Sequence, residues 1–102
     1  MTKSKKQLNA QLAALKEELP IRQTIAGLLY ADGFQLAITD YKERMTEAVQ
    51  AEDTKNISAY KKDLDVLFKF KSFLKTQEER AEQIPELISD IEYDLRQGDL
   101  FV

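Results

Sequence analysis

The residues of this chain that could do chemistry are mostly carboxylates, because its 102 residues include neither His nor Cys. The commonest general acid/base and the usual zinc ligands are therefore missing. Two sets of carboxylates have helical spacing and could bind a hard cation: Asp40, Glu43 and Glu47, and Glu86, Asp90 and Asp94. Such sets are far more often solvated helix faces. We therefore predict no enzymatic activity, no metal and no cofactor.

The last six residues of the sequence, Gln-Gly-Asp-Leu-Phe-Val (97–102), are unusual for a chain end because they include two large apolar side chains, Leu100 and Phe101. Termini are usually polar and poorly ordered unless something holds them. We expect Leu100 and Phe101 either to fold back on the protein's own core or to bind another protein. A Leu-Phe-Val carboxyl terminus could also enter a backbone nest of a peptide-binding domain.

The pattern Gln97-Gly98-Asp99-Leu100-Phe101 resembles the peptide by which many proteins bind the bacterial DNA polymerase sliding clamp. That peptide reads Gln, any residue, Ser or Asp, Leu, Phe. Polymerases, mismatch-repair proteins, clamp-loader components and regulators of initiation carry it. The resemblance implies that Leu100 and Phe101 fill an apolar cleft of the clamp. It also implies that Gln97 occupies a separate small pocket, while Asp99 supports the bound turn.

The rest of the chain favours helix throughout, since Leu, Ala, Glu, Lys and Gln dominate and there are only three Gly and two Pro. We predict an all-α bundle of four or five helices, with an elongated shape as one variant. We assign residues 1–96 to this helical domain and residues 97–102 to a clamp-binding tail.

One apolar stripe marks the first helix, with 4-3-4 spacing: Leu8, Leu12, Leu15 and Leu19. A narrow stripe of this kind is typical of a coiled-coil seam or of the edge of a bundle. Proline disfavours helix in the residue before it, so Pro20 is predicted to end the helix and a second short helix to follow. Two alternatives stay open: the stripe pairs with a second copy, or it packs on the protein's own bundle.

Turn-forming and polar residues predict where the next helix begins and ends. Asp32-Gly33 is the clearest turn signal in the chain. A helix is predicted from Phe34 to about Glu52, followed by a polar loop over residues 52–56.

A long helix is predicted next. It carries a first apolar stripe, Ile57, Tyr60, Leu64, Leu67 and Leu74, and a second one, Val66, Phe70 and Phe73. We expect this wide apolar face to lie at the centre of the core. We expect it to fade in the polar run from Gln77 to Gln83. Pro85 is then predicted to open a last helix, which Gly98 ends.

The net charge of −3 is unevenly distributed. Residues 55–75 carry six Lys against two Asp, whereas residues 76–102 carry eight acidic residues against two Arg. This alternation is typical of helices that attract one another. Lys55, Lys62 and Lys69 line one side of the long helix, where they could track a phosphate backbone. We favour the alternative that they hold the acidic last helix.

These observations favour a non-enzymatic accessory or inhibitor protein of DNA replication or repair, bacterial or phage-encoded, whose partner is the sliding clamp. A second copy of the chain is a further candidate partner, and any contact with DNA would be indirect. No apolar run reaches membrane-spanning length and no signal-peptide core is present, so we expect a cytoplasmic protein without a membrane partner. The alternatives are a helical assembly adaptor using the Leu8–Leu19 seam and a nucleic-acid binder using Lys55, Lys62 and Lys69.

Overall fold

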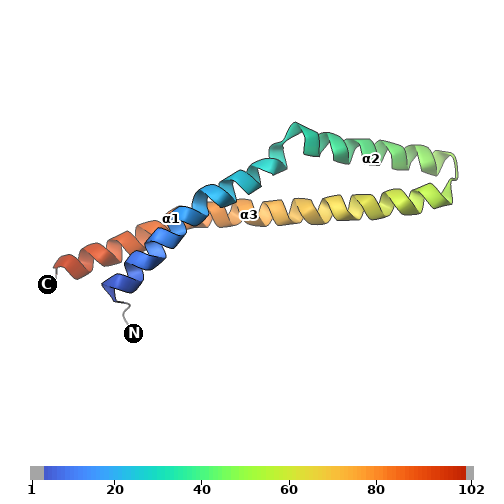
Figure 1. The fold of residues 1–102 in the computed structure, drawn as a ribbon. Helices are drawn as coiled ribbons and strands as arrows, with labels where there is room; N and C mark the ends of the chain where they lie inside the picture. The colour runs from blue at the N-terminus through green and yellow to red at the C-terminus, as the bar shows by residue number, and fades with distance from the viewer. Residues whose placement is uncertain (1–3, 101–102) are drawn as a thin grey trace.

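The protein is an elongated arrangement of helices, with a first arm of two successive helices and a returning arm of one (Figure 1). The computed structural model describes residues 4–100, with the side chains of residues 4–98. Its elements are α1 (Lys5–Gly27), the 3₁₀ turn η1 (Leu28–Tyr30), α2 (Asp32–Gln50) and α3 (Thr54–Leu100). Over these residues the chain has no strand. The expectation of an all-α, elongated fold is confirmed.

The predicted number of helices, four or five, is wrong, because residues 4–100 form three α-helices and one 3₁₀ turn. Both prolines lie inside helices rather than at their ends: Pro20 in α1 and Pro85 in α3. A proline removes one helical N–H donor and costs about 3 kcal/mol. Here α1 and α3 pack against each other, and that lateral packing continues on both sides of each proline and outweighs the local cost.

The predicted fading of the helix over residues 77–83 is also wrong, since α3 is unbroken there. Gln77 is only 4% exposed and keeps the inward position between the fully buried Leu74 and Ile84. The polar run therefore carries the buried row onward instead of ending it. The predicted stop at Gly98 is likewise wrong, because α3 continues to Leu100.

The break between α1 and α2 comes just before the predicted Asp32-Gly33 turn. Ala31 is extended, with φ −69° and ψ 132°, and Asp32 begins α2. The side-chain amide of Gln35 donates to the carbonyl oxygen of Leu29 at 2.7 Å, which joins η1 to α2. Asp32 starts a helix here because a carboxylate is favourable near the positive end of the helix dipole.

The loop between α2 and α3 lies where the sequence predicted a loop, but it is tighter. Thr54 already begins α3, and the carboxylate of Asp53 accepts a hydrogen bond from the backbone N–H of Asn56 at 3.2 Å. The backbone N–H of Asp53 donates to the carbonyl oxygen of Ala48 at 2.9 Å. Glu52 has a positive φ of 53°. Together these features form a Schellman motif whose left-handed residue is Glu52 instead of the usual glycine.

The hydrophobic core is thin because the molecule is one layer of helices thick. Its extents are 76 × 26 × 14 Å, and a helix with its side chains is about 10–12 Å across. The radius of gyration is 22.0 Å, against about 13 Å for a compact domain of this length. The buried apolar residues therefore form a narrow row between the two arms: Ala26, Leu29, Ile38, Ala48, Leu64, Leu74 and Ile84. The expectation that the second stripe of the long helix lies in the core is wrong, because Val66, Phe70 and Phe73 are exposed.

We predict that Glu52→Gly raises the free energy of unfolding by about 1 kcal/mol, because a left-handed backbone strains a residue with a Cβ and does not strain glycine. Urea titration followed by circular dichroism measures this change. The matched control is Glu43→Gly at an exposed position inside α2, which should lower the free energy of unfolding by about 1 kcal/mol. Equal destabilisation by both substitutions would contradict the prediction.

Candidate functional site

The clamp-like peptide lies at the end of α3, at the same end of the molecule as the start of α1 (Figure 1). Gln97 is half-buried and Gly98 is exposed. A Cβ built on Gly98 would meet nothing within 4 Å. The side chains of Asp99 and Leu100, and all of Phe101, lie outside the described residues. Packing against neighbouring atoms is thus not what requires glycine at position 98.

The leucine stripe of α1 lies on a helix that packs along α3. Leu8, Leu12, Leu15 and Leu19 are all half-buried. A salt bridge of 3.7 Å between Lys16 and Glu92 joins the same two helices. Packing on the protein's own helix therefore accounts for the observed burial, while pairing with a second copy through the same residues stays a prediction.

A polar cluster joins α1 to the middle of α3, and we call it the Glu18 cluster: Glu18, Arg22, Gln77 and Arg80. The two carboxylate oxygens of Glu18 accept hydrogen bonds from Nε and Nη2 of Arg80 at 3.0 and 3.1 Å. Nε of Arg22 donates to the same carboxylate at 3.1 Å, and Nη1 of Arg22 donates to the buried amide oxygen of Gln77. A bidentate pair of this kind fixes both the spacing and the rotation of the two helices.

The hydrogen bond from Arg80 lowers the pKa of Glu18 below its ordinary value, and Arg22 lowers this pKa further, while desolvation opposes both. The same bond with Glu18 raises the pKa of Arg80. Because the Glu18 side chain is 26% exposed, solvent screens the attraction. The main effect of the cluster is therefore to fix geometry.

The Glu18 cluster was not predicted from the sequence. Glu18 and Arg80 are 62 positions apart, and no local pattern connects them. Gln77 was placed in a region where the helix should fade, although its spacing from Leu74 and Ile84 gives it an inward position. This spacing could have identified Gln77 as an inward-facing residue, but the polar residues on both sides of it led us to predict the end of the helix.

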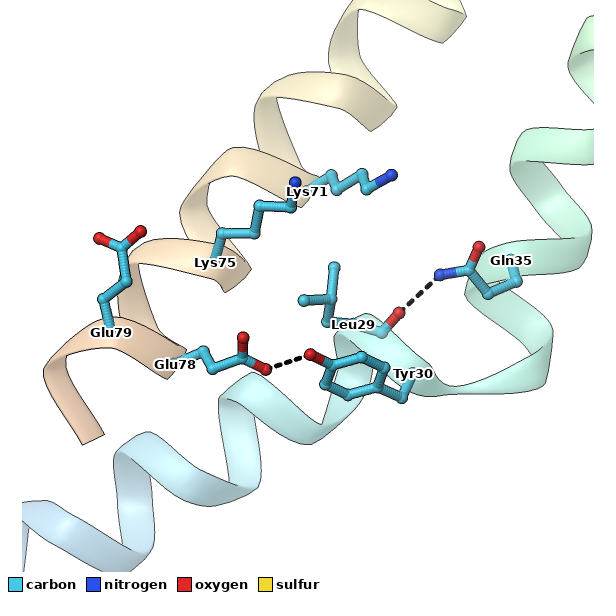
Figure 2. Close-up of a pocket in the computed structure, with 7 residues that line it drawn as sticks. All are labelled: Leu29, Tyr30, Gln35, Lys71, Lys75, Glu78 and Glu79. Carbon is cyan, nitrogen blue, oxygen red and sulfur yellow. Dashed lines mark hydrogen bonds between the residues drawn. The ribbon is translucent and has the colours of Figure 1, made fainter. Parts of the chain in front are cut away.

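A shallow groove of about 280 Å³ lies where η1 crosses α3 (Figure 2). The hydroxyl of Tyr30 donates to the carboxylate of Glu78 at 2.5 Å. Lys71 and Lys75, which precede Glu78 on α3, also line the groove. The hydrogen bond to Glu78 raises the pKa of Tyr30. This hydrogen bond joins η1 to α3.

The lysine residues that the sequence analysis singled out lie on an exposed face of α3. Lys55, Lys62 and Lys69 are all exposed. Our preferred interpretation, that they hold an acidic last helix, is wrong, because the acidic segment continues the same helix α3. Among the side chains of residues 4–98, no group of three or more His, Cys, Asp or Glu residues is placed to hold a metal ion.

No protein-family model, no curated protein and no solved structure matches this chain. In the part of the chain that the structure describes, no helix combines the length and the apolar character needed to cross a membrane.

We predict that acid destabilises the protein partly through Glu18. The pKa of Glu18 is lower in the folded protein than its ordinary value of 4.5, so its ionised form stabilises the fold above that pH. This contribution is lost as the pH falls through the folded-state pKa. Glu18→Gln should lower the melting temperature at pH 7 and weaken its fall as the pH drops through and below 4.5.

The matched control for this prediction is Glu17→Gln, which removes the same charge from an exposed neighbouring position on α1. It should leave the pH dependence of the melting temperature close to that of the native chain. Equal acid sensitivity in the native protein and in Glu18→Gln would contradict the assignment.

Proposed function

We propose that this protein is a non-enzymatic accessory or inhibitor of bacterial DNA replication or repair, cytoplasmic and either bacterial or phage-encoded. It binds the DNA polymerase sliding clamp through its last residues: Gln97, Asp99, Leu100 and Phe101. The observation that carries the proposal is the sequence pattern Gln97-Gly98-Asp99-Leu100-Phe101. The structure describes its first two residues, Gln97 and Gly98, near the end of the 47-residue helix α3.

Gly98 supports the proposal through the conformation it permits. Within a helix, glycine is about 1 kcal/mol less favourable than alanine, and no neighbouring atom requires a glycine at this position. What glycine offers is easy departure from the helix. A peptide that binds in an extended or kinked form has to leave the last helical turn, and Gly98 lowers the cost of that step.

The proposed binding energy comes mainly from two apolar side chains. Leu100 and Phe101 would each contribute roughly 1.5–3 kcal/mol on full burial. After the cost of ordering the peptide, we expect a dissociation constant in about the micromolar range. The clamp is a ring with more than one identical cleft, so two linked copies of the protein would gain avidity where their peptides span two clefts.

The body of the protein has a supporting role in this proposal. We propose that the leucine stripe of α1 packs on α3 as a coiled-coil seam, so that two helices hold the base of the peptide. The rod then either recruits a second factor to the clamp or blocks the cleft against polymerases. The second candidate function, a helical assembly adaptor, uses the same stripe: Leu8, Leu12, Leu15 and Leu19. The exposed part of these half-buried side chains favours it.

Titration against purified clamp tests the proposal directly. Full-length protein should bind with about micromolar affinity, and a version ending at Arg96 should not bind detectably. Leu100→Ala combined with Phe101→Ala should weaken binding at least about 100-fold, because both apolar anchors are lost. The matched control is Leu36→Ala with Val49→Ala, two exposed apolar positions on α2, which should leave binding unchanged.

A thermal melt of the same variants separates clamp binding from a tail that folds back on the body. Clamp binding predicts that the Leu100 and Phe101 substitutions leave the melting temperature unchanged, whereas fold-back predicts a lower one. Equal clamp binding by the full-length and truncated proteins, or binding by neither, would discard the proposal.

We further predict that Gly98→Ala weakens clamp binding about two- to five-fold, because alanine favours the helical form by about 0.5–1 kcal/mol. Isothermal titration calorimetry is the suitable measurement. Gly33→Ala is the matched control, since a Cβ there also meets nothing within 4 Å and the site is far along the chain. Tighter binding by Gly98→Ala would indicate that the clamp takes the peptide as a helix.

A further inference from the structure

An exposed stripe on the first half of α3 carries lysine and apolar side chains together. We call it the Lys62 stripe: Lys55, Lys62, Val66, Lys69 and Phe73. At about 100° per residue, its five residues lie roughly 140–200° around the helix from Leu64. Leu64 is buried, and α2 packs along this half of α3 (Figure 1). The stripe is therefore directed away from α2 and out to solvent.

The three lysines of the Lys62 stripe have no salt-bridge partner among the described residues. The acidic second half of α3 continues the same helix, so it does not reach back to neutralise them. Asp63 and Asp65 lie about 100° from Leu64 on either side, and they flank the stripe without entering it. Successive lysines are about 10 Å apart along the helix axis. A regular row of positive charges is thus left for an anion from outside the chain.

The aromatic ring at the end of the stripe is exposed and yet held in place. Phe73 is 48% exposed, and its ring stacks on that of Phe70 with centroids 6.0 Å apart and planes at 22°. Phe34 of α2 meets Phe70 edge-on at 5.7 Å, which anchors Phe70 to the body of the protein. Phe73 therefore presents an apolar ring to solvent, supported from behind and one helical turn from Lys69.

We propose that the Lys62 stripe binds single-stranded nucleic acid directly. The phosphates lie against Lys55, Lys62 and Lys69, and one base stacks on Phe73. Lysines bind phosphates through their charge, and aromatic rings stack on bases of any sequence. Duplex DNA fits less well, because its bases are already stacked and cost energy to extrude. The sequence led us to expect only an indirect contact with DNA, whereas the stripe supplies both groups that a direct contact needs.

The charge distribution along α3 limits where the strand lies. Residues 55–75 carry six Lys against two Asp, whereas residues 76–102 carry eight acidic residues against two Arg and repel phosphates. The stripe itself is about 27 Å long at 1.5 Å per residue. The strand is therefore confined to the first half of α3. This site is separate from the peptide that begins at Gln97, and it does not depend on clamp binding.

Two other partners fit the Lys62 stripe less well. An amphipathic helix that lies on a membrane separates its apolar face from its basic face, whereas here lysines and apolar residues share one stripe. A second copy bound through the same stripe would bring Lys62 and Lys69 against like charges, which is unfavourable. A ligand that is both anionic and flat meets neither difficulty.

Fluorescence anisotropy with labelled oligothymidylate and oligouridylate tests the proposal on the full chain, and the two probes distinguish DNA from RNA. Three phosphate contacts on a single strand predict a slope of about −2 for the logarithm of the binding constant against that of the salt concentration. Lys62→Gln with Lys69→Gln should bring this slope to about −0.7 and weaken binding about 10- to 100-fold at about 50 mM salt. Phe73→Ala should weaken binding at least about fivefold and leave the slope unchanged.

The matched control is Lys61→Gln with Lys75→Gln, which removes the same charge from exposed positions on another side of α3. It should keep a slope of about −2. Glutamine and alanine are good helix formers, so circular dichroism should show unchanged helix content in all three variants. Binding of a duplex, which offers no free base, should not respond to Phe73→Ala.

Four outcomes overturn the proposal. The first is no binding of either oligonucleotide at about 100 µM protein. The second is an equal loss for the two lysine pairs, which would show diffuse attraction instead of a site. The third is single-strand binding that Phe73→Ala leaves unchanged, with heparin, a polyanion without bases, bound equally well. The fourth is tighter binding to phosphatidylserine vesicles than to either oligonucleotide, which would assign the stripe to a membrane surface.

Discussion

The structure depends on one continuous row of inward-facing side chains along α3. A helix of 47 residues is not stable in water on propensity alone and needs packing along its length. Buried or half-buried residues recur every three or four positions along α3 and form this row: Ile57, Tyr60, Leu64, Leu67, Lys71, Leu74, Gln77, Ala81, Ile84, Ile88, Ile91 and Leu95. Their spacing alternates between three and four, as in a coiled coil, except for two consecutive steps of three, from Lys71 to Leu74 and from Leu74 to Gln77. Such a break rotates the inward face of a helix.

The break in spacing coincides with the change of packing partner. Before Leu74 the row is directed at α2, and after Gln77 it is directed at α1. The Glu18 cluster lies at this junction, where Arg80 holds Glu18 with two hydrogen bonds. An apolar row alone permits two helices to slip by a heptad, whereas a bidentate ion pair accepts one register. A single polar layer has this register-setting effect in coiled coils, and we assign the same effect to the Glu18 cluster.

The helical structure and many of the inward-facing residues could be predicted from the sequence because both follow from local periodicity. The stripe of α1 and the first stripe of α3 were recognised for this reason, whereas the second stripe of α3, Val66, Phe70 and Phe73, is exposed. The boundaries failed where a local rule competed with tertiary packing, as at Pro20 and Pro85, which lie inside packed helices. The Glu18 cluster could not be predicted, because its members meet only once α1 and α3 are side by side. The tail was recognised from the order of its residues, a signal that does not depend on packing.

The inward-facing row also determines which residues of α3 remain exposed. The half that packs on α2 leaves Val66, Phe70 and Phe73 exposed, and the half that packs on α1 leads to Gln97. Phe70 and Gln97 are about 40 Å apart at 1.5 Å per residue, with the Glu18 cluster between them. A helix held rigidly at its middle transmits position along its length but little conformational change. Contacts made near Phe70 would therefore leave the local conformation at Gln97 little changed.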